Sequence, residues 1–221
     1  GGYVNFCENV AYDVPGAAYV EEDGRGIGAF RRNIAIRSVG TGRPDAFNED
    51  SQLRDVGFSG HGFFFRGNIA DAEDNIAVSI AHSAYAWSNK GDSRLPINDL
   101  MVPASSLHDP ELALGGDSIL WEAAPTKVFR RNVAIASGMA IGASFWMGPD
   151  IQDHDGRSEI RDFTGWNLAG TVGALIHYTR RLTIINMKLT RDASLGGRGL
   201  YGIQADTNAT GDHVYDGVSV S

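Results

Sequence analysis

The sequence predicts an all-β fold, a right-handed parallel β-helix in which a single strand of chain winds through three parallel sheets. The first observation is a short phrase of Asn, an aliphatic residue and Ala, and self-similarity at a period of a few tens of residues is typical of a solenoid. The second is that short apolar runs end at Gly, Asn and Asp, with no helical pattern of any length. The phrase begins at Asn9, Asn33, Asn68, Asn75, Asn132 and Asn167.

The spacing of the phrase fits one coil of such a solenoid, because Asn33 follows Asn9 by 24 residues. Neighbouring rungs are separated by about 4.8 Å, so equivalent residues form columns. We expect the Phe that often precedes the phrase and its aliphatic residue to point inward, with Ala where the coil is narrow. We expect the Asn to take the left-handed conformation at a corner and to hydrogen-bond along the axis. Asn68 and Asn75 are too close in sequence to share a column, so one of them lies on another sheet.

Length and composition exclude several classes of protein. The chain has 221 residues, enough for one domain over residues 1–221, and a net charge of −8, which argues against a nucleic-acid partner. No apolar run reaches the roughly 20 residues that span a bilayer, so we expect no membrane insertion. The single cysteine, Cys7, excludes an intramolecular disulfide and is expected to be a buried thiol. Neither terminus resembles a solenoid cap, so we expect a segment of a longer solenoid.

Three stretches depart from the repeat and are expected to be loop excursions. They cover residues 41–57, 88–127 and 148–158, and the second holds four of the seven prolines and a possible short helix near Pro110–Leu114. Ordered insertions of this length usually contact a ligand or a partner.

One stretch carries a family resemblance. Asn9 to Phe30 reads N-V-A-Y-D-V-P-G-A-A-Y-V-E-E-D-G, followed after five residues by Phe, and Gly60-His61-Gly62 and Gly202-Ile203 fit the same pattern. This resembles the β-helix region of the cell-migration-inducing hyaluronidase family, of the related fibrocystin-like surface proteins and of secreted bacterial relatives. The first coil has Gly16-Ala17 where that family often has Gly-His. The resemblance implies an extracellular or cell-surface protein that contacts glycans.

Two acidic stretches are candidate calcium sites, because carboxylate oxygens are the ligands that Ca²⁺ prefers. The first consists of Glu21, Glu22 and Asp23, followed by Gly24, which permits a tight turn. The second consists of Asp150, Asp153 and Asp155, whose spacing is not that of an EF-hand. The alternative for both is a solvated acidic loop.

Paired arginines recur in the same phase of the repeat, which predicts a column of guanidinium groups. Arg31 and Arg130 begin pairs just before an Asn, Arg66 takes the equivalent place before Asn68, and a further pair begins at Arg180. Such a column suits the carboxylates or sulfates of an acidic polysaccharide. Trp87 and Trp146 complete the predicted substrate-binding set. The alternative is a column paired with the chain's own Asp and Glu.

Two residues are candidates for catalysis. His61, between two glycines, is the best general acid or base by residue type, although a structural histidine is the alternative. Arg66 is a candidate by analogy with β-helical polysaccharide lyases, in which an arginine acts beside Ca²⁺. A glycoside hydrolase would instead need paired carboxylates, and the sequence does not show such a pair.

Two functions therefore remain open. The first is an extracellular module that binds, and in one version cleaves, a polysaccharide as a lyase or glycoside hydrolase. The second is a non-enzymatic structural module of a surface protein or filament, whose loops contact neighbouring chains.

Overall fold

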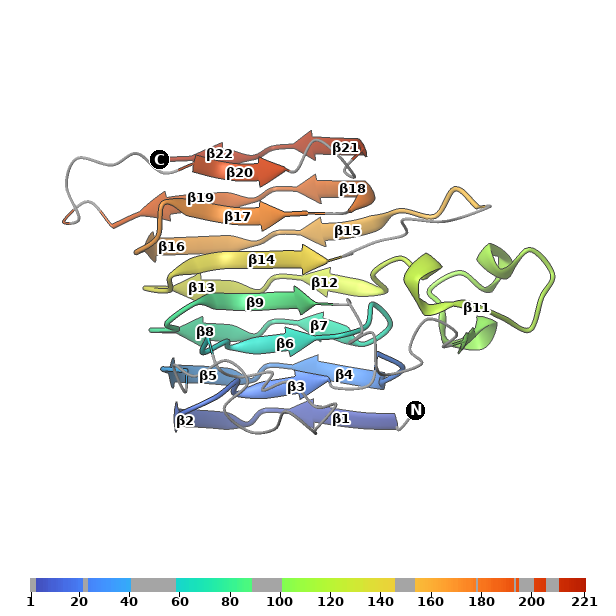
Figure 1. The fold of residues 1–221 in the computed structure, drawn as a ribbon, viewed down its shortest axis with the longest axis horizontal. Helices are drawn as coiled ribbons and strands as arrows, with labels where there is room; N and C mark the ends of the chain where they lie inside the picture. The colour runs from blue at the N-terminus through green and yellow to red at the C-terminus, as the bar shows by residue number, and fades with distance from the viewer. Residues whose placement is uncertain are drawn as a thin grey trace, which may run out of the picture.

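The computed structural model describes residues 3–21, 24–40, 59–88, 101–145, 154–177, 179–192, 194, 201–205 and 211–221. Its strands form three parallel sheets, and successive strands of the chain visit the sheets in turn (Figure 1). Each coil stacks on the one before, so that the colour changes steadily from one end of the column to the other. The predicted parallel β-helix is confirmed.

Each coil contributes at most one strand to each of the three sheets. The first sheet consists of β1 (Tyr3–Cys7), β4 (Ile27–Arg31), β7 (Asp71–Glu73), β12 (Val128–Arg130), β15 (Ser158–Arg161), β18 (Arg180–Ile185) and β21 (Gly211–Asp216). The second consists of β2 (Val10–Val14), β5 (Ile34–Ser38), β8 (Ile76–Val78), β13 (Val133–Ile135), β16 (Thr164–Leu168), β19 (Lys188–Arg191) and β22 (Ser219–Val220). The third consists of β3 (Tyr19–Glu21), β6 (Phe63–Phe65), β9 (Ser83–Ser88), β14 (Met139–Phe145), β17 (Val172–Ile176) and β20 (Tyr201–Ala205).

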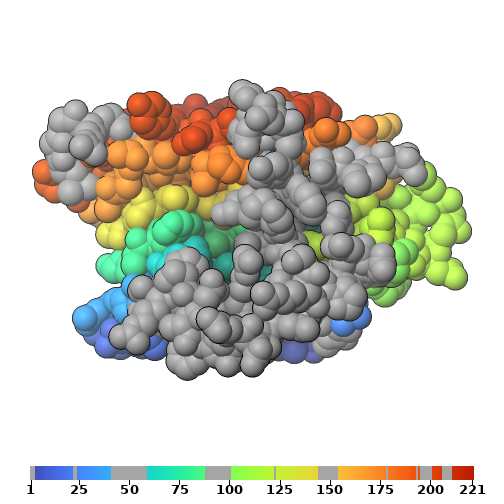
Figure 2. Space-filling model, in the orientation of Figure 1, coloured from blue at the N-terminus to red at the C-terminus, as the bar shows by residue number. Residues whose placement is uncertain are grey.

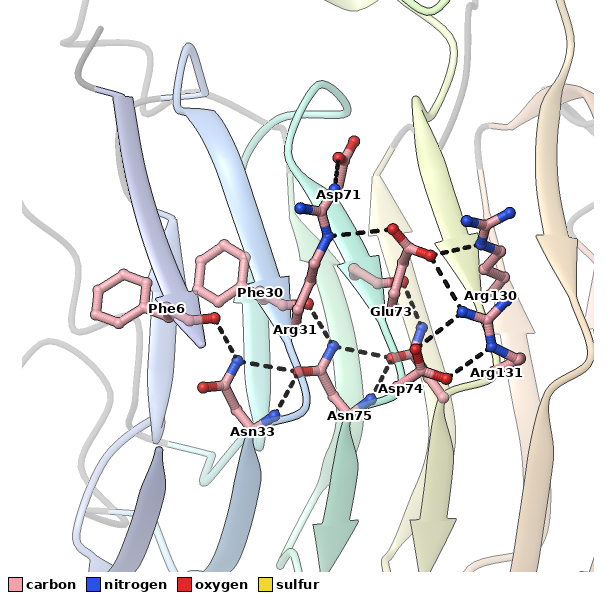
Figure 3. Close-up of polar contacts among 12 residues, drawn as sticks. Phe6, Phe30, Arg31, Asn33, Asp71, Glu73, Asp74, Asn75, Arg130 and Arg131 are labelled. Atoms are coloured by element: carbon pink, nitrogen blue, oxygen red, sulfur yellow. Dashed lines mark hydrogen bonds and ion pairs between the residues drawn. The ribbon is translucent and has the colours of Figure 1, made fainter. Parts of the chain in front are cut away.

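A ladder of asparagines runs along the corner between the first and second sheets. The backbone N and Nδ2 of Asn33 both donate to Oδ1 of Asn75 at 3.0 Å, and Asn75 donates in the same way to Asn132 at 3.0 Å (Figure 3). Asn9 makes the same two bonds to Asn33 at 3.1 Å. Asn33, Asn75 and Asn132 are fully buried, so the ladder satisfies polar groups that would otherwise be costly.

The ladder also shows which asparagines of the repeat occupy equivalent positions. Its steps span 24, 42 and 57 residues, so the insertions lengthen the second and third coils without breaking the column. Asn75 is the member of the ladder, whereas the side chain of Asn68 donates to the carbonyl of Ala124 in the inserted segment. Phe163 and Met187 take the place of the asparagine in the coils after Asn132. Their carbonyls accept a backbone hydrogen bond from the next coil, as the carbonyl of Asn132 does, and their side chains are buried.

The left-handed residue at this corner is the one before the asparagine, and not the asparagine as we expected. It has a positive φ in each coil, and its N–H donates to a carbonyl of the next coil. These residues are Glu8, Arg32, Asp74, Arg131, Asp162, Asn186 and Gly217. Because a left-handed residue reverses the alternation of side chains, the asparagine is directed inward and can form the ladder.

The side chains of the second sheet point the opposite way to our expectation. Ala35, Ala77 and Ala134 are fully buried and stack on one another, whereas the aliphatic residues on either side of each alanine are only partly buried. The reason is the period of two along a strand: since the alanine points inward, its neighbours must point outward. The prediction that the aliphatic residue of the phrase forms the core is therefore wrong for Ile34, Ile76 and Val133, whereas Ile69 and Leu168 are buried as expected.

Aromatic side chains of the first and third sheets fill much of the core in the earlier coils, and aliphatic residues such as Ile141, Ile160 and Leu182 fill it in the later coils. Tyr19, Phe63 and Tyr85 stack with ring centroids 4.8 and 5.0 Å apart. Trp87 lies 5.0 Å from the rings of both Phe65 and Phe129 and is only 2% exposed. This burial corrects the predicted substrate-binding role of Trp87, because its ring is unavailable at the surface.

Residues 101–127 project from one side of the column (Figures 1 and 2). They contain the antiparallel pair β10 (Met101–Pro103) and β11 (Ser118–Leu120) and three 3-10 turns, η2 (Ala104–Ser106), η3 (Pro110–Ala113) and η4 (Trp121–Ala123). Asp109 caps η3 through a bond from the N–H of Glu111 at 3.0 Å, which confirms a short helical turn here. A second small core of Val102, Leu107, Trp121 and Ala124 joins the segment to Ile69 of the column.

We predict that replacing Asn75 by Ala destabilises the protein far more than the same change at Asn9. The change at Asn75 leaves buried donors of Asn33 and acceptors of neighbouring coils without partners, at a cost of about 2–4 kcal/mol. Asn9 is exposed at the first coil, so its loss should cost about 1 kcal/mol or less. Urea unfolding of both variants measures the difference, and equal costs would show that the ladder does not hold the corner.

Candidate functional site

The predicted arginine column on the first sheet is interrupted by an acid. In the register of the sheet, Arg31 aligns with Glu73, Glu73 with Arg130, and Arg130 with Arg161. The arginine pairs that begin at Arg31 and Arg130 are therefore two coils apart. The coil between them places Glu73 in the same column. A parallel sheet brings neighbours within about 5 Å, so Glu73 lies between Arg31 and Arg130, whereas Arg130 and Arg161 are neighbours of like charge.

Glu73 is the centre of this column (Figure 3). Its carboxylate accepts bonds from Nε of Arg31 at 3.2 Å, Nε of Arg130 at 2.5 Å and an Nη of Arg131 at 3.3 Å, and its side chain is 9% exposed. Burial acts to raise the pKa of Glu73, but the bonds and charges of Arg130 and Arg31 outweigh it and hold the pKa below its usual value. Glu73 is therefore ionised at neutral pH and holds two arginines of the column.

Asp71 is the second carboxylate partner of Arg31, at 2.5 Å. Burial raises the pKa of Asp71, against the opposing charges of Lys127 and Arg31. Within the described part of the chain, its Oδ1 is buried without a hydrogen-bond partner. Asp71 and Glu73 therefore provide Arg31 and Arg130 with carboxylate partners from this chain. An acidic ligand would have to compete with these carboxylates for the arginines.

The other two predicted arginines lie outside this column. Arg66 follows β6 of the third sheet, where its N–H donates to the backbone and side chain of Glu21. Arg180 begins β18, and the residue of β18 that aligns with Arg161 is Ile185. The prediction that Arg66 stacks with Arg31 and Arg130 is wrong, because Arg66 and the Asn68 phrase lie in the connection between β6 of the third sheet and β7 of the first.

His61 lies at the start of the third sheet beside a second histidine, His82, with ring centroids 5.2 Å apart. Burial, together with the charge of His82, lowers the pKa of His61 to about 4, and no carboxylate contributes to the shift. Its Nδ1 is buried without a partner among the described residues. His61 is thus a neutral imidazole at neutral pH, and among the described residues no carboxylate contributes to its pKa shift as an orienting partner of a catalytic histidine would.

Glu21 has a structural contact in place of the metal role that we expected. One carboxylate oxygen accepts from the N–H of Gly26 at 2.9 Å, and the other accepts from the N–H groups of Arg66 and Gly67 at 3.1 and 2.8 Å. The side chain is buried, and its oxygens are committed to closing the turn. Asp155 is fully exposed and pairs with Arg181 at 3.3 Å.

The remaining candidates fall outside the described residues: Glu22, Asp23, Asp150, Asp153 and Trp146. Within the described ranges, no group of three or more His, Cys, Asp or Glu side chains is placed to hold a metal ion. Cys7, expected to be buried, is an exposed free thiol at the first coil.

The outer side of the second sheet carries a surface that sequence reasoning missed. Two columns of apolar residues run along five consecutive strands, which we call the aliphatic face. They are Val10, Ile34, Ile76, Val133 and the adjacent Thr164 in one column, and Tyr12, Ile36, Val78, Ile135 and Trp166 in the other. Val10, Tyr12 and Trp166 are 64%, 65% and 57% exposed. The signal was present in the repeat, since the small alanine marks the inward position and its two neighbours the outward one.

One edge of the aliphatic face is lined by the left-handed corner residues, which alternate in charge from coil to coil. The order is Glu8, Arg32, Asp74, Arg131, Asp162. Arg32 pairs with Glu8 at 2.6 Å, and Arg131 pairs with Asp74 at 2.7 Å. We call this row the charged corner. A contiguous apolar area rimmed by charged residues is typical of an interaction surface.

Comparison of the chain with family models, with curated proteins and with solved structures finds no match. The resemblance to the hyaluronidase-related β-helices therefore remains a prediction. In the part of the chain that the structure describes, no helix has the length and apolar character needed to cross a bilayer.

We predict that His61 makes the protein less stable in acid. Its pKa is about 4 in the folded protein and 6.5 in an unfolded chain, so unfolding takes up a proton between these values. Stability therefore falls as the pH is lowered from about 6.5 to 4, by up to about 3 kcal/mol. Chemical unfolding of wild type and His61→Gln across this range measures the effect, and the difference between their stabilities should be constant above pH 7 and change as the pH is lowered. Parallel curves at all pH values would contradict the burial of a neutral His61.

Proposed function

We propose that this chain is a non-enzymatic structural module that presents the aliphatic face to another protein surface. The observation that carries the proposal is the face itself, five strands long, apolar in both columns and rimmed by charge. Parallel sheets that face water alone usually carry polar residues outward, so an apolar outer face is best explained by a partner that covers it.

The polar groups support the same proposal. Glu73, Glu21 and the corner carboxylates each hold backbone or arginine groups of their own chain. Their contacts run between coils, so they stabilise the column and are not free for substrate. An extracellular or cell-surface location is compatible with such a module and is part of the proposal.

A second candidate function is polysaccharide binding, and one observation favours it. Tyr12 and Trp166 are exposed aromatic residues in the same outward column, four coils apart, which corresponds to about 19 Å. Aromatic rings on a flat surface can stack on sugar rings. On this candidate the sugar would lie along the aliphatic face, and not on the arginine column that we first expected, and calcium would not be needed for binding.

Incubation with a panel of polysaccharides, acidic and neutral, with and without Ca²⁺, tests for an enzyme. We expect no shortening of any chain by size analysis, because no carboxylate contributes to the pKa shift of His61 and the carboxylate of Glu21 is held by backbone N–H groups. If a polysaccharide binds without being shortened, Tyr12→Ala and Trp166→Ala should weaken the binding together. Shortening of one polymer by the protein would overturn the non-enzymatic proposal.

Binding of a fluorescent apolar dye at submicromolar protein tests whether the aliphatic face is accessible. We expect the fluorescence of wild type to fall in Val133→Lys, because the charge interrupts the centre of the face. Glu159→Lys, on the outer side of the first sheet, is the matched control and should leave the signal unchanged. Equal fluorescence in all three proteins would show that the face is not exposed in solution.

A further inference from the structure

The aliphatic face has the features of a self-complementary surface. Its two outward columns have nearly the same chemistry in neighbouring coils, since Ile76 and Val78 of β8 align with Val133 and Ile135 of β13. A two-fold rotation that exchanges these two strands therefore places aliphatic residues opposite aliphatic residues. An isologous contact of this kind needs one patch that matches itself.

Resting on the proposed function above, we propose that the partner of the aliphatic face is a second copy of this chain. The two copies pack face to face with their solenoid axes antiparallel. The two-fold axis lies along the strand direction, between β8 and β13. Ile76 of one copy then faces Val133 of the other, and Val78 faces Ile135.

The charged corner is compatible with this arrangement. With the axis between β8 and β13, Asp74 faces Arg131 of the second copy and Arg32 faces Asp162. Glu8 faces Asn186, which carries no charge. Every charged residue of the row thus meets an opposite or neutral one. The side chains of Glu8, Arg32, Asp74 and Arg131 are 67%, 56%, 37% and 45% exposed, so they can reach across while keeping their own partners.

An axis centred on a strand brings like charges together. Centring the axis on Asp74 would place Arg32 opposite Arg131 and Glu8 opposite Asp162. Parallel packing would bring the charged corner against the corner at the other edge of the face, where Asp13 and Arg37 have the same order of charge. Like charges at an interface are strongly disfavoured, so the alternation favours an axis that lies between two neighbouring strands over one centred on a strand.

The size of the face sets the strength of the association. Five strands about 4.8 Å apart, with three to five residues at about 3.3 Å each, give roughly 240–400 Å² of flat face per copy. The two copies together bury roughly 500–800 Å² without the rim, which is below the usual size of a specific complex. We therefore expect a reversible dimer with a dissociation constant that is roughly micromolar or weaker.

A pair of complementary variants tests this register. Ile76→Lys and Val133→Glu each bury an unpaired charge in a homodimer, so each alone should associate about tenfold or more weakly than wild type. In a mixture of the two, residue 76 of one chain faces residue 133 of the other, and the new charges pair. Sedimentation analysis from submicromolar to submillimolar protein should show dimer for wild type and for the mixture, and monomer for each variant alone.

Circular dichroism of the variants confirms that both are folded, and Glu159→Lys again serves as the control that should dimerise like wild type. A mixture that stays monomeric while wild type dimerises would overturn the antiparallel register. Wild type that is monomeric throughout would overturn self-association. In that case a dye signal that still depends on Val133 would leave the proposed function intact, whereas loss of that dependence would remove both.

Discussion

The corner between the first and second sheets is the constraint on which the rest of the column depends. Each turn places one residue in the left-handed conformation, which is costly for residues other than glycine. The cost is offset by a backbone bond to the next coil and, from Asn9 to Asn132, by paired bonds of the asparagine ladder. Because every ladder bond joins two coils, the corner fixes their phase even where the chain between them carries long insertions.

The phase of the coils determines which side chains lie on the outer surfaces of the first and second sheets. The reversal at the corner directs alanines inward and aliphatic residues outward on the second sheet, which creates the aliphatic face. On the first sheet, the same phase brings Glu73 between Arg31 and Arg130 and makes the column self-neutralising. The surface that sequence reasoning regarded as polar and ligand-binding is thus occupied by its own ion pairs. The surface that it regarded as core is the one available to a partner.

The repeat phrase was sufficient to predict the parallel β-helix and an axial asparagine ladder, because both depend on residue type and period. The direction of the side chains could not be obtained from the phrase, since a single left-handed residue before Asn33 inverts it. Insertions caused the other errors: Arg66 precedes an Asn phrase that lies outside the strands, between β6 and β7, and Glu73 occupies the position that Arg66 was given. Burial of Trp87 depends on Phe65 and Phe129 from different coils, and this contact is not visible in local sequence.

The measurement that tests the account most directly is the reactivity of single cysteines on neighbouring positions of β8. In a Cys7→Ser background, Ile76→Cys and Ala77→Cys are labelled with a thiol reagent under native conditions at submicromolar protein. The account predicts rapid labelling at position 76, which faces outward, and protection at position 77, where the alanine is fully buried. Protection at position 76 together with rapid labelling at position 77 would place the aliphatic residues in the core and contradict the account.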